Sequence, residues 1–75
     1  MRSYAIQLRT IADVKEFARI VNACDVDIDL SSGRYVVDAK SIMGVFSLDL
    51  GKPLRVDVHG DSPDGLEAEL KRFFL

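Results

Sequence analysis

The chain has 75 residues, of which 48% are hydrophobic and 29% charged, and its formal net charge is −2. This length predicts a single domain over residues 1–75, and the composition is that of a globular chain rather than a disordered one. The slightly negative charge provides no basic surface for a nucleic acid. No apolar run approaches the roughly 18 residues that span a membrane. Because the start lacks a hydrophobic signal region, we expect a cytoplasmic protein.

The first third of the chain alternates and then takes on a helical pattern. Residues 3–9 alternate between apolar and polar side chains, which predicts a half-buried strand. Thr10 follows as a helix N-cap, with Asp13 three residues later as its acidic partner. We expect a helix to run from there to residues 22–23. Its apolar face is formed by Ile11, Val14, Phe17, Ala18 and Val21.

Residues 24–30 alternate almost perfectly, which predicts a second strand. A turn over residues 31–33 then leads into a third strand over residues 34–39, so the two strands form a hairpin. Cys24, the only cysteine, excludes an internal disulfide. It falls on the apolar side of the alternation, and we expect a small core side chain rather than a reactive thiol.

The second half of the chain predicts two helices around a strand. Ser41 begins a short helix that ends near Phe46, and Gly44 within it costs roughly 1 kcal/mol relative to alanine. Residues 54–59 alternate as a fourth strand. Ser62–Pro63 has the pattern of an N-cap followed by proline at the first helical position. The last helix has an apolar stripe of Leu66, Leu70 and Phe73.

Each expected strand has one apolar face and one polar face. Three helices that cover the apolar faces would give a two-layer α+β sandwich with one bare side. The order of elements is strand, helix, strand, strand, helix, strand, helix. This order and the absence of any repeat or linker support a single compact unit.

The segment Lys40–Leu48, with the sequence KSIMGVFSL, resembles the regulatory-serine segment of the HPr family. These proteins are the small phosphocarriers of the bacterial sugar phosphotransferase system. The resemblance implies the HPr fold, an open-faced sandwich in which three helices lie on one face of a four-stranded antiparallel sheet (βαββαβα). Between Gly33 and Ser41 the chain is one residue longer than common HPr sequences, so we expect a shifted or bulged third strand.

The chain departs from the family pattern at the phosphorylation site. The family carries phosphate on a histidine at the start of the first helix, with an arginine two residues later and then a proline. Aligning residues 14–30 without a gap places Thr10 at the histidine position, Ala12 at the arginine and Asp13 at the proline. A threonine hydroxyl is a poor nucleophile without a base. The resemblance therefore implies no catalytic residue, as in the catabolite-repression HPr-like members, which lack the histidine but keep the serine.

The resemblance also implies a regulatory role for the Ser41 helix. Ser41 stands where HPr kinase modifies the family's serine, and a phosphate there would lie at the positive end of a helix. The alternative is that Ser41 only caps the helix. Ile42, Met43 and Phe46 correspond to the apolar patch that docks enzyme I, the kinase and a transcriptional regulator. The alternative is that Ile42 or Phe46 belongs to the core.

The remaining polar clusters favour ordinary surface roles. Carboxylates spaced about 6–7 Å apart along a straight strand do not converge on a calcium ion. We therefore expect no metal, and three side chains that solvate the open sheet face opposite Arg34 or Arg55: Asp25, Asp27 and Asp29.

The only histidine, His59, is expected on the same polar face as a surface residue. Arg9 and Lys15 could bind an anion at the start of the first helix, or they could be plain surface charges. No phosphate-cradling glycine loop is present, and no cofactor is expected.

Our leading hypothesis is a non-enzymatic HPr-like protein that has lost histidine phosphotransfer. It would act as a regulatory or protein-binding module through the Ser41 helix, with no nucleic-acid or membrane partner. Two rivals stay open. One is a phosphocarrier that uses another residue, with His59 as the only imidazole. The other is a structural module that self-associates as a homo-oligomer through Ile42, Met43 and Phe46.

Overall fold

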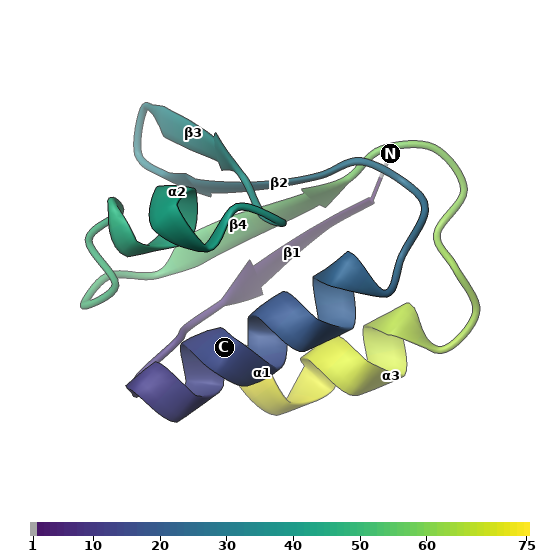
Figure 1. Ribbon diagram of the computed structural model, residues 1–75, viewed down its shortest axis with the longest axis horizontal. Coiled ribbons are helices and arrows are strands. Elements are labelled where there is room, and N and C mark those ends of the chain that lie inside the picture. Colours follow the sequence, from purple (N-terminus) through teal and green to yellow (C-terminus); the bar gives the residue numbers. More distant parts are fainter. Residues whose placement is uncertain (1) are drawn as a thin grey trace.

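Four strands form one antiparallel sheet in the computed structural model, which describes residues 2–75 (Figure 1). The strands are β1 (Arg2–Ile6), β2 (Ile28–Ser32), β3 (Tyr35–Asp38) and β4 (Leu54–Val58), in the spatial order β1-β4-β2-β3. The helices are α1 (Ile11–Asn22), α2 (Ile42–Phe46) and α3 (Leu66–Leu70), the last continued by a 3-10 turn, η1 (Lys71–Phe73). All of them lie on one face of the sheet, which confirms the predicted two-layer α+β sandwich. Within residues 2–75, no helix combines the length and hydrophobicity needed to cross a bilayer.

The apolar faces of the sheet and the helices meet in one buried core. Phe17 of α1 and Phe73 of η1 pack edge to face, with ring centroids 6.1 Å apart and an interplanar angle of 77°. The predicted stripe of Leu66, Leu70 and Phe73 is buried, as expected. These contacts hold α1 against α3, which lie side by side in Figure 1.

The second strand begins four residues later than the alternation predicts. The Cys24 amide donates a hydrogen bond to Val21 O (3.1 Å), so Cys24 still belongs to the turn that ends α1. Pairing with β4 begins only at Ile28, opposite Val58. Cys24 is half-buried against the core, and burial raises the pKa of its thiol. This placement is that of an unreactive packing residue.

The β2–β3 hairpin is regular, and the bulge predicted for the third strand is absent from its paired residues. The pairs run without interruption from Asp29 opposite Asp38 to Ser32 opposite Tyr35. The loop is therefore Gly33–Arg34 rather than residues 31–33. Gly33 has φ +59° and no residue other than glycine has a positive φ in residues 2–75, which is the pattern of a two-residue type II′ turn.

The last helix begins at Leu66 rather than after Ser62. Gly65 adopts a left-handed conformation (φ +85°), so the right-handed helix cannot extend back through it towards Ser62. The predicted cap at Ser62–Pro63 is therefore wrong, and both residues lie in the preceding loop. Glu67 pairs with Arg2 across the fold (3.6 Å), at exposed positions where such a pair contributes little stability.

Tyr4 contains the one buried side-chain polar atom without a hydrogen-bond partner in residues 2–75. Its ring stacks on Phe74, with centroids 5.3 Å apart and an interplanar angle of 19°. The ring therefore packs well, while its hydroxyl oxygen has lost water and gained no protein partner. A buried unsatisfied hydroxyl costs free energy of folding.

We therefore expect Tyr4→Phe to raise the free energy of unfolding by about 1 kcal/mol, or about 4–8 °C in Tm for a domain of this size. Thermal denaturation followed by circular dichroism measures the shift. Tyr35→Phe is the matched control, because Tyr35 is 70% exposed and its hydroxyl is solvated. A loss of stability on Tyr4→Phe would contradict this assignment.

Candidate functional site

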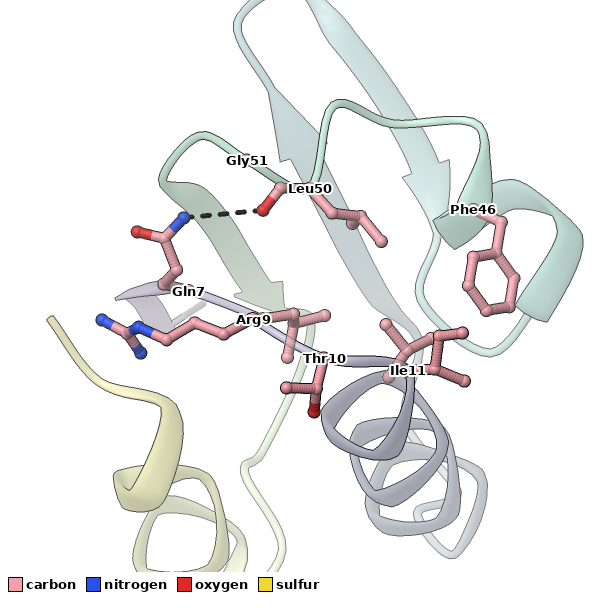
Figure 2. A pocket seen from close by; sticks show the side chains of 9 residues that line it. Gln7, Arg9, Thr10, Ile11, Phe46, Leu50 and Gly51 are labelled. Atoms are coloured by element: carbon pink, nitrogen blue, oxygen red, sulfur yellow. Dashed lines mark hydrogen bonds between the residues drawn. The ribbon is translucent and has the colours of Figure 1, made fainter.

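The region around Thr10 is a closed helix cap. Thr10 Oγ1 accepts a hydrogen bond from Asp13 N (3.0 Å), and the Asp13 carboxylate accepts one from Arg9 N (2.9 Å). These bonds confirm the predicted capping pair and place a carboxylate at the positive end of α1. The Arg9 guanidinium extends away from Thr10 (Figure 2). The geometry therefore opposes the anion site considered for Arg9 and Lys15.

A depression of about 380 Å³ lies beside Thr10 (Figure 2). It is lined by the loop between β1 and α1 (residues 7–10), the start of α1, Phe46 of α2 and the loop that follows α2. Gln7 Nε2 donates to Leu50 O at its rim (3.5 Å), while Ile11 and Phe46 supply apolar wall. The depression thus extends from Thr10 at the start of α1 to Phe46 of α2.

Ser41 caps α2, as predicted. Its hydroxyl oxygen accepts a hydrogen bond from Gly44 N (3.2 Å), and the residue is exposed to solvent. Gly44 has a packing role that the sequence pattern did not reveal: a Cβ there would lie 3.2 Å from Val37 Cβ and 3.3 Å from Ser41 Oγ. The missing side chain lets α2 lie close against β3. Gly44 lowers the helix propensity of α2, but it also allows α2, with Ser41 at its start, to pack at this distance from β3.

One side of α2 is apolar and exposed. Met43 is 78% exposed, Phe46 46% and Ile42 43%, whereas Val45 between them is fully buried. Ile11 is 65% exposed and lines the same depression as Phe46. The helical pattern had placed Ile11 on the buried face of α1, which is wrong because the first turn of this helix lies beside the depression. We refer to Ile11, Ile42, Met43 and Phe46 as the α2 patch.

His59 lies at the opposite end of the sheet from Thr10. It directly follows β4, whose last residue Val58 is paired with Arg2 at the start of β1, whereas Thr10 comes after the end of β1. The four residue steps of the strand alone span about 14 Å. His59 Nε2 lies 2.8 Å from Asp29 Oδ2, and its amide donates to Asp27 O (2.9 Å).

The three alternating aspartates do not form a site. Only Asp29 lies in a strand, and its neighbours across the sheet are Asp57 and Asp38. Arg55 pairs with Asp57 instead, so the expected pairing of these aspartates with Arg34 or Arg55 is wrong. No group of three or more histidine, cysteine or acidic side chains in residues 2–75 is placed to hold a metal ion.

The open face of the sheet contains one buried ionised group that sequence reasoning missed. Asp57 is 6% exposed and accepts hydrogen bonds from Ser3 Oγ (2.5 Å) and from Arg55 Nε and Nη2 (3.1 and 3.0 Å). Burial alone raises the pKa of this carboxyl, but the Ser3 hydrogen bond and the Arg55 guanidinium outweigh it and hold the pKa below its usual range. This cluster fastens β1 to β4.

The comparisons with known proteins agree with this architecture. The family model described as the PTS HPr component phosphorylation site matches residues 9–74. The chain belongs to the HPr family. It is similar to the crystal structure of HPr-C-His from Thermoanaerobacter tengcongensis, with 22% identity, a TM-score of 0.80 and coverage of 96% of this chain and 89% of that chain. It is also similar to the histidine-containing phosphocarrier protein of Mycoplasma, with 15% identity, a TM-score of 0.74 and coverage of 95% and 89%. A search of curated proteins finds no match.

At these identities the two structures establish the HPr fold. Family membership places the chain among the HPr components of the phosphotransferase system. The exposure of the α2 patch and the Thr10 cap are observed in this chain itself and are not carried over from the two similar structures.

Proposed function

We propose that this HPr-family protein does not relay phosphate through a histidine. It acts instead as a regulatory or protein-binding module through Ser41 and the α2 patch. The observation that carries the proposal is the exposed apolar side of α2 directly after an accessible N-cap serine. The protein is non-enzymatic in this proposal. Its partners are an HPr kinase, enzyme I or a transcriptional regulator.

The chemistry at Thr10 supports the loss of the relay. The Thr10 oxygen is engaged with Asp13 N, and the described contacts place no imidazole or other base on it. The neighbouring Asp13 carboxylate would repel an incoming phosphoryl group. His59 is separated from this region by the length of β4 and is engaged with Asp29. A phosphocarrier acting through His59 would need a donor docked at the other end of the sheet.

The experiment is incubation with HPr kinase and ATP, read by mass spectrometry. We expect one phosphate on Ser41, lost completely in Ser41→Ala. Ser47→Ala is the matched control, since Ser47 is an exposed serine of the same segment and should leave labelling unchanged. Because Ser41→Ala also removes a cap worth about 1 kcal/mol, its fold is checked by circular dichroism. No phosphate on Ser41, with a true HPr labelled in parallel, would refute the regulatory role.

A second arm tests the relay with enzyme I and phosphoenolpyruvate. We expect no acid-labile phosphate on the chain. Labelling of His59, removed by His59→Ala, would show that the protein is a phosphocarrier and would overturn the proposal.

A further inference from the structure

Lys40, the residue directly before Ser41, has all three of its polar groups in contact with the protein. Its ammonium nitrogen Nζ donates a hydrogen bond to Cys24 O (2.6 Å), its amide donates to Asp38 Oδ1 (2.9 Å), and its carbonyl accepts from Asn22 Nδ2 (3.4 Å). Lysine side chains usually extend into solvent, but Lys40 is half-buried. The residue therefore links the segment that leads into α2 to the end of α1, which is far away in the chain.

The ammonium group of Lys40 lies just past the carboxyl end of α1. Its acceptor Cys24 directly follows Ala23, the C-cap residue of this helix. Carbonyl groups at this end of a helix carry a partial negative charge, which favours a cation. A hydrogen bond from a charged donor is roughly twice as strong as one between neutral groups. The Lys40–Cys24 bond is therefore stronger than the long, neutral bond from Asn22 to the same segment.

The segment before α2 is also held by the sheet. Ala39 is fully buried, and its amide donates a hydrogen bond to Ile28 O of β2 (2.9 Å). Ser41 N donates to Asp38 O at the end of β3 (3.0 Å). Ser41 therefore follows one residue that is fixed by the sheet and one that is fixed by the end of α1, so its position is set before any partner binds.

We propose that Lys40 is a positioning residue for Ser41, whose ammonium group holds the serine in place instead of offering a charge to the modifying enzyme. This role rests on the proposed function, because it concerns how Ser41 is presented to a kinase. In that reaction Ser41 Oγ forms a bond to the γ-phosphorus of ATP, the bond from this phosphorus to the β-phosphate oxygen breaks, ADP leaves, and the hydroxyl proton passes to a base of the kinase. Ordering a mobile segment costs free energy of binding. A serine that is already held avoids this cost.

The test measures hydrogen exchange of the Ser41 amide by NMR and kcat/KM for phosphorylation of Ser41 by HPr kinase. Lys40→Met keeps an unbranched side chain and removes the charge. We expect it to speed up the exchange about fivefold and to lower kcat/KM by about the same factor, chiefly through a higher KM. Asn22→Ala removes the weaker bond and should move both quantities in the same direction by a smaller factor. Lys52→Met is the matched control, because the Lys52 side chain is 72% exposed, and it should change neither quantity.

A fall in kcat/KM with unchanged exchange at Ser41 would overturn the proposal, because the kinase would then recognise the Lys40 charge directly. Faster exchange at Ser41 without a change in kcat/KM would also overturn it. So would equal acceleration at Ser41 and in β4, which pairs on both sides and reports global unfolding. A wild-type chain that HPr kinase never labels would refute the proposed function instead. The exchange measurement needs no kinase, so it would still decide whether Lys40 holds Ser41 in place.

Discussion

Replacing Phe17 with alanine is expected to lower the free energy of unfolding by about 3–5 kcal/mol. Phe17 is fully buried, and its ring packs edge to face on Phe73. The change therefore removes the contact that holds α1 to the C-terminal turn and leaves a cavity between them. A domain of this length has a total stability of about 4–11 kcal/mol. The loss is therefore a large fraction of the total stability, and the variant should unfold at a much lower urea concentration than the wild type.

Urea denaturation at 25 °C, followed by circular dichroism, measures the loss. Phe46→Ala is the matched control, because Phe46 is also a helical phenylalanine but is 46% exposed on the α2 patch. It should cost less than about 1 kcal/mol. Equal losses in the two variants would mean that the core does not depend on the Phe17–Phe73 contact.

The second large effect is expected at Asp57. Asp57→Ala removes the acceptor for Ser3 Oγ and for two Arg55 nitrogens from a nearly buried position. Hydrogen bonds to charged groups contribute about 1.5–3 kcal/mol each in favourable cases, and the exposed Arg55 regains water. We therefore expect a total loss of about 2–3 kcal/mol at pH 7, measured by urea denaturation. Asp25→Ala at an exposed position is the control and should change stability by less than about 0.5 kcal/mol.

The pH dependence follows from the lowered pKa of Asp57. A carboxyl whose pKa is lower in the folded state stabilises the fold fully above its unfolded pKa of about 3.9. That contribution is lost as the pH falls through the folded pKa. The stability difference between wild type and Asp57→Ala should therefore be constant from pH 7 to about pH 5 and shrink below pH 4. A difference that persists undiminished at pH 2 would contradict the assigned ionisation.

Much of the fold follows from local patterns in the sequence. The Thr10 and Ser41 caps and the apolar stripe of Leu66, Leu70 and Phe73 depend on residues close together in the chain, and each lies where predicted. The strands occur in the predicted order.

The errors are at the ends of helices and strands. These ends are set by a partner strand far away in the sequence or by the backbone conformation of a single residue. β1 ends at Ile6 instead of residue 9. β2 begins at Ile28, where its pairing with β4 begins, and α3 begins only after the left-handed Gly65.

The candidate site was predicted only in part. The residues of α2 were identified through the family resemblance, and their exposure is a finding of the structure. Ile11 was assigned to the core because helical periodicity does not report where a helix extends past the sheet. Asp57 was read as one polar residue of an alternating strand, since the sequence does not show that Ser3 and Arg55 converge on it.

The sequence by itself determined the order of elements, the Thr10 and Ser41 caps and the presence of a single histidine late in the chain. These are properties of neighbouring residues or of composition. Only the tertiary structure decided that His59 lies at the far end of the sheet, that Asp57 is buried and that Ile11 joins the α2 patch. The physical reason is that strand order, register and packing depend on contacts between residues far apart in the chain.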